Sequence, residues 1–495
     1  MRPARRRPNR GWLGRSVGLV IAGIVVGGAL LLWSVASGTS PAVGHNPQTR
    51  ALFGTWHVVY DTQAPALTLV IAAIGLALIF AAGVAVTERV VLDRSRRSTD
   101  VRTKLLAPRL VMAETRGVFG GPVRVTVLIP AHDEAASIGA TLASLGAQDP
   151  APDRIIVVAD NCTDATESIA RAHGVDVFPT VNNTQRKAGA LNQALRTLLD
   201  ELGDNDVVMC MDADTVLDEG FLAAAVQRFT DDRALMAIGG LFYGEEGHGL
   251  LGQLQRNEYV RYSREIKRRR GRVFVLTGTA SLFRARALRT VAESRGRVLP
   301  GVPGDVYDTA ALTEDNELTL AIKSLGGLMA SAAGCRVVTE LMPTTRNLWT
   351  QRLRWQRGAL ENLGAYGPAP TMLRYWAQQV GIGYSVIALS SFWLMLSIMV
   401  LASDQWVWFP FWIGVGTVFV VDRVVSVWKG GWKARVLAML LFPELLYDMF
   451  LDAVYVKGIF DITFARDASW GHVVRASASA TEAPTGHRER TGAAA

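Results

Sequence analysis

Two carboxylates that directly follow an apolar segment are the first residues in this sequence whose types and spacing could do chemistry. The run DVVMC at 206–210 leads into Asp212 and Asp214. Residues two apart in an extended segment point the same way, so these carboxylates would share one face. Such a pair suits a hard cation and leaves room for diphosphate oxygens. The alternative is a solvated turn.

A further carboxylate, Asp160, ends the apolar segment RIIVVAD at 154–160. A carboxylate just beyond a parallel strand can accept hydrogen bonds from a base or a ribose. Asp160 or Thr163 could instead only cap the following helix. The residues alone leave both interpretations open.

The acidic segment TEDNE at 313–317 opens the helix-like run LTLAIKSLG. Thr313 is a natural N-cap residue, and acids suit a first helical turn, so helix stabilisation alone could explain the pattern. In the functional interpretation, Asp315 stays ionised at the helix N-terminus and serves as a general base.

The segment QRLRW at 351–355 precedes the last apolar block of the chain. Its Arg side chains could clamp a diphosphate, and Trp355 offers a flat apolar face for a sugar ring. A basic and aromatic belt at a membrane surface would use the same residue types. The basic run at 261–272 predicts a lipid-facing or solvated face, because no nucleic-acid-binding motif accompanies it.

These residues need a scaffold, and the stretch 88–370 has the alternating pattern of an α/β domain. Strand-like runs lie at 123–131, 154–160, 206–212 and 233–240, and helices are expected to begin near Ala135, Thr163, Lys187 and Glu219. Near-continuous apolar strands that alternate with helices predict a parallel sheet covered on both faces. Ligands of such sheets bind at the carboxyl ends of the strands, where the acidic segments fall.

The bulk composition predicts membrane segments on both sides of this domain. The 495 residues exceed one ordinary core, 49% of them are hydrophobic, and the net charge is +8. Uncharged runs at 17–36 and 66–86 are long enough to span a bilayer, although the first could be a signal peptide. Arg-rich flanks at 2–15 and 89–109 then predict a cytoplasmic N-terminus and catalytic domain.

After residue 370, the runs 378–402 and 406–421 are expected to span the membrane. A third run, 435–456, carries acids on one helical face, at Glu444, Asp448 and Asp452. Acids within a membrane normally line a cavity or pathway, whereas an interfacial helix with one wet face is the alternative. We expect one C-terminal apolar segment, either 435–456 or the front of 371–402, not to span fully, because 457–475 has a cytoplasmic-looking composition.

Taken in order, these segments resemble the processive family 2 glycosyltransferases, which include the cellulose, chitin, hyaluronan and poly-N-acetylglucosamine synthases. The motifs are VLIPAHDE, VVADNCTDAT, RKAGALN, MDADT, TGTASLFR, TED and QRLRW, and they cover about 118–360. The resemblance implies a GT-A type, Rossmann-like α/β domain with a mixed, mainly parallel sheet, helices on both faces and flanking transmembrane helices. The expected parts are a basic arm with two spans at 1–117, the catalytic domain at 118–370, transmembrane and interface helices at 371–460, and a partly disordered tail at 461–495.

The resemblance also implies roles on the donor side. Asp160 would contact the uracil or ribose of a UDP-sugar, and Lys187 would lie near the nucleotide. Asp212 and Asp214 would hold Mg²⁺ or Mn²⁺ on the diphosphate. This sequence has Arg186 where family members often have Gly before the lysine.

On the acceptor side, the resemblance makes Asp315 the catalytic base. Gln351, Arg354 and Trp355 would bind the diphosphate and the acceptor sugar, and Thr279, within 277–280, would lie beside the acceptor. The implied reaction is an inverting single displacement from a UDP-sugar to a growing glycan. The protein would be multi-pass in the plasma membrane, in contact with lipids and not with nucleic acid.

Two alternatives remain at this point. One is a non-processive transferase that adds a single sugar to a lipid or short acceptor. The other is a transporter or scaffold with a degenerate nucleotide-binding domain, which the intact acidic motifs argue against. A dehydrogenase is disfavoured because no GxGxxG follows the first strand. The identity of the sugar is not assigned by these motifs.

Overall fold

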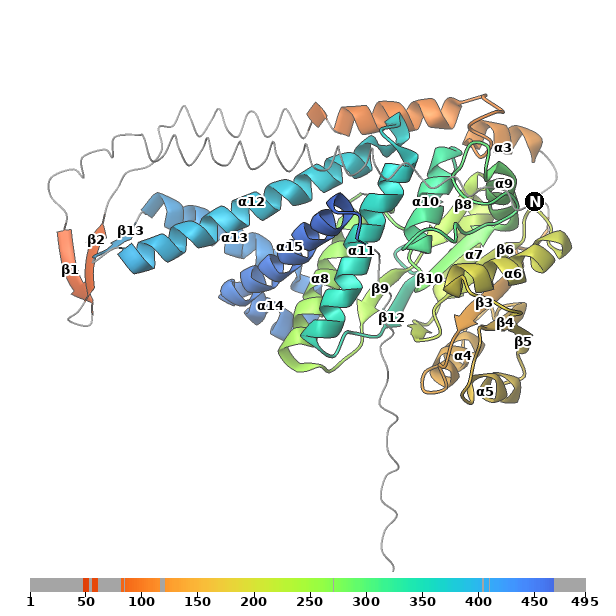
Figure 1. Cartoon of the computed structure of the whole chain (residues 1–495), viewed down its shortest axis with the longest axis horizontal. Helices are drawn as coiled ribbons and strands as arrows, with labels where there is room; N and C mark the ends of the chain where they lie inside the picture. Colours follow the sequence, from red (N-terminus) through yellow and green to blue (C-terminus); the bar gives the residue numbers. More distant parts are fainter. Residues whose placement is uncertain are drawn as a thin grey trace, which may run out of the picture.

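The computed structural model describes residues 48–52, 56–60, 82–83, 85–115, 121–269, 271–402, 405–408 and 410–466. The basic arm, the expected span at 17–36, most of that at 66–86 and the tail from 476 lie outside these residues. The described chain has a mixed α/β domain and a set of long helices that extends away from it (Figure 1).

A seven-stranded sheet with the order β11-β8-β10-β6-β3-β4-β5 forms the centre of the domain. Its strands are β3 (Val125–Ala131), β4 (Arg154–Ala159), β5 (Asp176–Pro179), β6 (Val207–Met211), β8 (Leu235–Gly239), β10 (Ala280–Arg284) and β11 (Leu328–Ala330). Only β10 runs antiparallel to its neighbours in this sheet. The expected mixed, mainly parallel sheet is confirmed, and the four expected strands are β3, β4, β6 and β8.

Helices cover both faces of this sheet because its strands are apolar on both sides. Along β3, Leu128 packs into one core cluster, whereas Val127 and Ile129 pack into the other. The first cluster includes α3 (Pro108–Glu114), α6 (Arg186–Glu201), α9 (Ala285–Ser294) and α10 (Glu314–Ser324). The second includes α4 (Ile138–Gly146), α5 (Thr166–Ala172) and α7 (Phe221–Asp231). The four helices expected from the sequence begin within three residues of their expected starts.

A second, three-stranded sheet and two long helices complete the catalytic domain. The sheet has the order β7-β12-β9, with β7 (Thr215–Leu217), β9 (Leu241–Gly244) and β12 (Arg336–Thr339). The long helices are α8 (Gly249–Arg268) and α11 (Thr345–Tyr366), and α11 contains the QRLRW segment. Both helices lie between the main sheet and the C-terminal helices (Figure 1).

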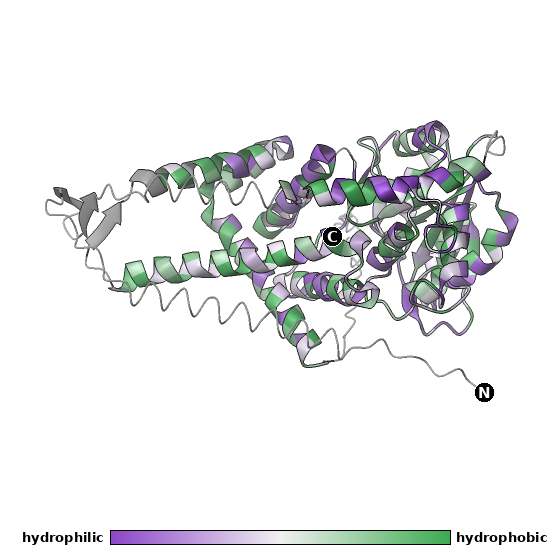
Figure 2. Cartoon of the chain, turned by 90° about the horizontal axis from the view of Figure 1, so that it is seen from above, coloured by the Kyte–Doolittle hydropathy of each residue, from purple (hydrophilic) through white to green (hydrophobic). Residues whose placement is uncertain are grey.

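The chain continues through η1 (Pro370–Met372) into α12 (Leu373–Ala402), which contains the expected span at 378–402. In the described part of the chain, Pro370–Leu401 is the one helical stretch whose length and composition suffice to cross a membrane. Much of its surface is apolar (Figure 2), and Leu394, Ile398 and Leu401 are exposed.

The expected span at 406–421 is not one helix. It begins with β13 (Gln405–Trp408), and α13 (Pro410–Ser426) follows. Pro is favoured at the first position of a helix, since its missing N–H would have no intrahelical partner there. The residues of β13 include Val and Trp, which are enriched in strands.

A small sheet joins a segment near the N-terminus to the connection between α12 and α13. The strands β1 (Gln48–Leu52) and β2 (Trp56–Tyr60) are antiparallel, and β2 pairs with β13 in parallel. The segment between the two expected N-terminal spans therefore lies beside the connection from α12 to α13 (Figure 1). We expect this arrangement if both connections lie on the same side of a membrane.

The acid-bearing run at 435–456 is divided between α14 (Gly431–Leu440) and α15 (Phe442–Thr463), after the short η2 (Trp428–Gly430). Glu444 is completely buried, accepts a 2.8 Å hydrogen bond from Asn257 Nδ2 of α8, and pairs with Arg261. Asp448 pairs with Arg423 of α13 at 2.6 Å. These two acids therefore neutralise Arg side chains of α8 and α13, which neither sequence interpretation anticipated.

The end of α15 returns to the α/β domain, where Arg357 Nη2 of α11 donates a 2.6 Å hydrogen bond to the carbonyl oxygen of Arg466. Residue 466 therefore lies on the same side of a membrane as this domain, which the Arg-rich flanks predict to be the cytoplasmic side. An Arg466→Cys variant, with the three native cysteines replaced by Ala, should react with an impermeant maleimide only after the cells are opened. Gln405→Cys, on β13, should react in intact cells and serves as the control. Reaction of position 466 in intact cells would contradict the prediction.

Candidate active site

Charged side chains from three separate segments meet at the carboxyl edge of the main sheet. Lys187, in the first turn of α6, places its Nζ 2.5 Å from Asp212 Oδ1 and 3.3 Å from Glu314 Oε1. Asp315 follows Glu314 at the start of α10. The sequence predicted Lys187, Asp212 and Asp315 as site residues but gave Glu314 no role.

Asp160 follows β4 at the same edge and is buried. Its Oδ1 accepts hydrogen bonds from Thr180 Oγ1 (2.8 Å), Asn183 Nδ2 (2.8 Å) and Asn161 Nδ2 (3.1 Å). The N-cap of α5 is Ala165, so neither Asp160 nor Thr163 caps that helix. The capping alternative is therefore wrong. The three hydrogen bonds all go to Oδ1 and hold the Asp160 side chain in place, and Oδ2 takes no part in them.

The turn before Lys187 has a backbone conformation that glycine adopts without strain. Arg186 has φ 58°, in the left-handed region that an L-residue rarely adopts. Asn183 Nδ2 donates a 2.8 Å hydrogen bond to the Arg186 carbonyl oxygen and holds this turn. The turn therefore forms although Arg186 stands where family members often have Gly.

The carboxylates of Asp212 and Asp214 are both partly exposed, and Thr215 Oγ1 donates to Asp214 Oδ1 at 3.3 Å. Among the residues that the structure describes, no three His, Cys, Asp or Glu side chains are grouped to hold a metal. Mg²⁺ is often held by only one or two carboxylates, with substrate phosphates and water as its other ligands. The pair therefore fits a cation whose coordination the substrate completes.

Gly278 connects the two acidic segments through its backbone. Its N–H donates to Asp315 Oδ2 at 3.1 Å, and its carbonyl oxygen accepts from the Asp212 N–H at 3.1 Å. A Cβ at this position would lie 2.8 Å from Lys187 Nζ and 3.3 Å from Asp212 Oδ2, so a side chain here would displace the Lys187 ammonium from its ion pair with Asp212. Thr279, the residue predicted to lie beside the acceptor, follows Gly278. Its Oγ1 lies at a hydrogen-bond distance of 2.8 Å from Thr277 Oγ1.

The Asp315 carboxylate is held at both oxygens by backbone donors, since Asn316 N–H donates to Oδ1 at 2.7 Å. Burial and the neighbouring Glu314 raise the pKa of Asp315 to about 6, although Lys187 and the two backbone N–H groups lower it. The sequence-based argument from the helix dipole alone predicted a permanent anion. The structure instead gives a carboxylate that ionises near neutral pH.

Lys187 balances this acidic cluster. Burial lowers its pKa, but the charges of Asp212, Glu314 and Asp315 outweigh that effect and raise the pKa above the ordinary value of lysine. Lys187 therefore remains a cation throughout the physiological pH range.

The start of α10 packs against α11 in a way that the sequence did not indicate. Thr313 occupies the N-cap position, but its side chain makes no capping hydrogen bond. Asn362 Nδ2 of α11 instead donates to the Thr313 carbonyl oxygen at 3.0 Å and to Oγ1 at 3.1 Å. A Cβ on Gly358 would lie 2.5 Å from Thr313 Oγ1, so glycine is needed for this close approach. The expected side-chain cap is wrong because a helix 49 residues away takes the hydroxyl.

Arg352 is an arginine of the QRLRW segment to which the resemblance assigned no role. Its side chain is 3% exposed and donates to Glu258 Oε2 at 2.9 Å and to Gln351 Oε1 at 2.7 Å. Its guanidinium carbon lies 4.3 Å from the centre of the Trp355 ring. Arg352 thus contacts both Gln351 and Trp355, and it orients both side chains.

The helix α8 lies within electrostatic reach of both the QRLRW segment and the acidic residues Asp214 and Asp315. Burial raises the pKa of Tyr259, Arg352 lowers it, and the charge of Asp214 raises it further, so Tyr259 lies within electrostatic reach of both. Burial also raises the pKa of Tyr262, and Asp315 contributes to that shift. Of the predicted residues, Arg354 has a partly exposed side chain on the same helix as Trp355.

The comparisons with known proteins concern the part of the chain that carries Asp160, Lys187, Asp212 and Asp214. Residues 126–292 match the model of glycosyl transferase family 2. This part of the chain therefore resembles the family 2 glycosyltransferases. In this region it resembles poly-β-1,6-N-acetyl-D-glucosamine synthases.

One such relative, from Staphylococcus aureus (strain COL), is 27% identical over 246 residues, which cover 48% of this chain and 55% of the relative. Another, from Staphylococcus epidermidis, is 25% identical over 261 residues, which cover 51% and 58%. The chain thus matches just over half the length of these curated relatives.

Solved structures with a similar course include the mannosyltransferase PcManGT from Pyrobaculum calidifontis in complex with GDP-Man and Mn²⁺. It is 17% identical, with a TM-score of 0.43 and coverage of 79% of this chain and 99% of that one. Glucosyl-3-phosphoglycerate synthase from Mycobacterium tuberculosis is 17% identical, with a TM-score of 0.33 and coverage of 53% and 83%.

The pKa of Asp315 leads to a prediction about pH. If the Asp315 anion accepts a proton during transfer, kcat/KM should fall about tenfold per pH unit below pH 6, because the active anion is lost as pH falls through its pKa of about 6. Glu314→Gln should move this acid limb to lower pH, since it removes a charge that raises the pKa of Asp315. Rates measured from pH 4.5 to 8 check both statements. A flat wild-type profile, or an acid limb that Glu314→Gln does not move, would contradict the prediction.

Proposed function

We propose that this chain is a membrane-bound, inverting glycosyltransferase that transfers a sugar from a UDP-sugar to a growing polysaccharide. The observation that carries the proposal is the convergence of Asp212, Lys187 and Asp315 around the Gly278 backbone. A base that ionises near neutral pH lies there beside residues suited to a diphosphate. The names of the relatives suggest N-acetylglucosamine as the sugar to test first.

In the proposed reaction, Asp315 removes the proton of an acceptor hydroxyl while its oxygen attacks the anomeric carbon. The bond from that carbon to the UDP oxygen breaks in the same step, so the configuration inverts. The N–H groups of Gly278 and Asn316 each hold one oxygen of Asp315 and thereby orient the base. A positioned base of this kind typically contributes 10²–10⁴-fold to the rate.

On the donor side, we assign Asp160 to the nucleotide and Arg354 to the diphosphate. Mg²⁺ or Mn²⁺, held by Asp212 and Asp214, would supply positive charge to the diphosphate when bound. Lys187 keeps Asp212 in place from its Oδ1 side and adds a permanent positive charge next to the leaving group.

On the acceptor side, we assign Thr279, Gln351 and Trp355 to the acceptor sugar. A cavity of about 640 Å³ lies beside α11, between α12 and α15, and its lining includes Trp349, Trp393 and Asp452. Aromatic faces with a few polar groups suit a sugar chain. This cavity favours extension of a polymer over addition of a single sugar.

The experiment that tests the function is a panel of UDP-sugars offered to the purified full chain with Mg²⁺ or Mn²⁺. We expect UDP release with UDP-N-acetylglucosamine and a product of high mass on a gel. Release accompanied only by a singly extended acceptor would establish the non-processive alternative. No release with any UDP-sugar would overturn the proposal.

Two matched substitutions should separate the base from the cation site. Asp315→Asn keeps the shape but removes the basicity, so transfer should fall roughly 10²–10⁴-fold while metal-dependent UDP binding stays nearly unchanged. Asp214→Asn should weaken metal-dependent UDP binding, since it removes a cation ligand. Calorimetric UDP binding and transfer rates, with thermal midpoints as the folding control, measure both effects. Near-wild-type transfer by folded Asp315→Asn would rule out the base assignment.

Trp355 provides the prediction about product length. Trp355→Ala should abolish the polymer and leave UDP-sugar binding intact, because a stacked aromatic contributes about 1 kcal/mol and a misplaced acceptor hydroxyl costs further in rate. Trp355→Phe retains a ring and should restore partial polymerisation. Polymer of normal length from folded Trp355→Ala would show that the ring serves only to pack against Arg352.

A further inference from the structure

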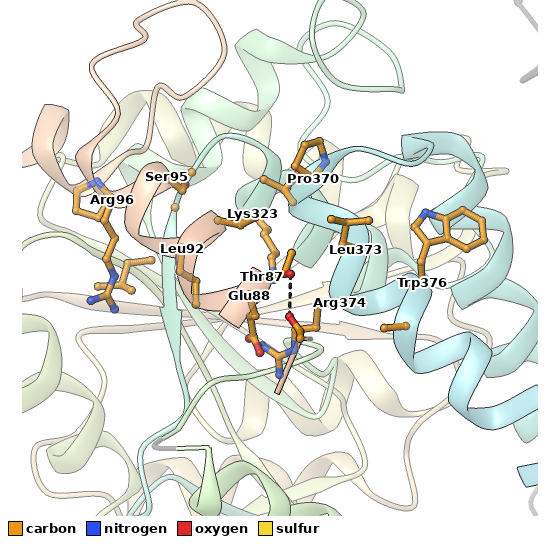
Figure 3. A pocket seen from close by; sticks show the side chains of 18 of the residues that line it. Thr87, Glu88, Leu92, Ser95, Arg96, Lys323, Pro370, Leu373, Arg374 and Trp376 are labelled. Carbon is orange, nitrogen blue, oxygen red and sulfur yellow. Dashed lines mark hydrogen bonds and ion pairs between the residues drawn. The ribbon is translucent and has the colours of Figure 1, made fainter. Parts of the chain in front are cut away.

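A cavity of about 460 Å³ lies away from the catalytic edge, between the helix at 85–97, the C-terminal end of α10 and the start of α12 (Figure 3). Its size is within the range of binding sites for small molecules. Its wall is mainly apolar and includes Val91, Leu92, Leu373, Trp376, Ala377 and Val380. None of the residues assigned to donor, acceptor or cation lines it.

One end of this cavity carries buried positive charge. The Arg374 side chain is only 8% exposed and lies 3.1 Å from Glu88. Within the described part of the chain, its Nε and Nη2 atoms are buried and have no hydrogen-bond partner. A buried guanidinium with unused donors is costly, so its geometry suits an anion that accepts two hydrogen bonds.

Lys323, in the last turn of α10, adds a second cation at the same end (Figure 3). Burial and the nearby Arg374 lower the pKa of Lys323 to about 8, and Glu88 only partly offsets them. With Arg96, the cavity has three basic residues against the single carboxylate of Glu88. The lining therefore has an excess of positive charge that an anionic ligand would balance.

The position of the cavity indicates where its ligand comes from. Arg374 is the second residue of α12, which continues as the candidate membrane span Pro370–Leu401. A cation at the first turn of such a helix lies at the level of lipid headgroups, and the apolar wall continues toward Val380 along the same helix.

We propose that this cavity binds an anionic glycerophospholipid of the surrounding bilayer, with its phosphate against Arg374 and Lys323 and one acyl chain along the apolar wall. Such a lipid offers a phosphate to the unused donors of Arg374, which reach it when the side chain turns toward the cavity, and fills the apolar space with one molecule. It also links the membrane to α10, whose first turn carries Asp315 and whose last turn carries Lys323.

Native mass spectrometry of the purified full chain with added lipid tests this site directly. Phosphatidylglycerol should bind about tenfold more tightly than phosphatidylcholine with the same acyl chains. Phosphatidylglycerol carries a net negative charge, whereas phosphatidylcholine is neutral overall. Lys323→Gln should remove most of this preference. Lys433→Gln, which removes an exposed lysine of α14, is the matched control and should leave the preference unchanged. Ala377→Leu should weaken phosphatidylglycerol binding by filling the apolar end.

Thermal midpoints identify folded variants, and Ala377→Leu supplies the test if Lys323→Gln does not fold. Equal binding of the two lipids to the wild-type chain would overturn the proposal, as would equal effects of Lys323→Gln and Lys433→Gln. Glycerol 1-phosphate, a soluble probe without acyl chains, should not displace phosphatidylglycerol. If it does, the cavity takes a soluble anion and the lipid assignment is wrong.

Discussion

The arrangement of the catalytic edge depends on the ion pairs of Lys187. Three carboxylates approach one another there, and like charges at short range would drive one of them to take up a proton. The ammonium of Lys187 lies 2.5 Å from Asp212 and 3.3 Å from Glu314, and its charge also acts on Asp315. Because Lys187 stays charged, these acids can share one edge while Asp315 retains a pKa of about 6.

A second set of buried charges fixes the helix that carries Asp315. Arg295 of the segment after α9 is fully buried and donates to Glu317 Oε2 of α10 at 2.7 Å. Tyr366, at the end of α11, donates to Glu317 Oε1 at 2.6 Å. Loss of Arg295 or of Glu317 would leave the other as an unpaired buried charge, which typically costs about 3–5 kcal/mol. Asp315 therefore lies on a helix held from two sides.

The contact between the catalytic domain and the C-terminal helices is also polar. Glu258 of α8 accepts hydrogen bonds from Arg352 of α11 at 2.9 Å and from Tyr447 of α15 at 2.7 Å. Arg352 also lies on the Trp355 ring. A shift of α15 would therefore reach Trp355, which is proposed to hold the acceptor, through Glu258 and Arg352. The helices beyond the domain thus support the position of Trp355 as well as any membrane association.

The sequence by itself determined the local features of this protein. Continuous apolar runs located β3, β4, β6 and β8, since a strand buried on both faces must be apolar throughout. The carboxylates beyond those strands, and Asp315 at a helix start, were recognisable because their neighbours in sequence define the element. The tertiary structure alone decided their environment: the pKa of Asp315, the role of Gly278 and the partner of Thr313. It also decided that Glu444 pairs with Arg261, although its spacing suggested a polar path. Burial and Coulomb energies depend on groups brought together from distant segments, and spacing along a chain does not encode those distances.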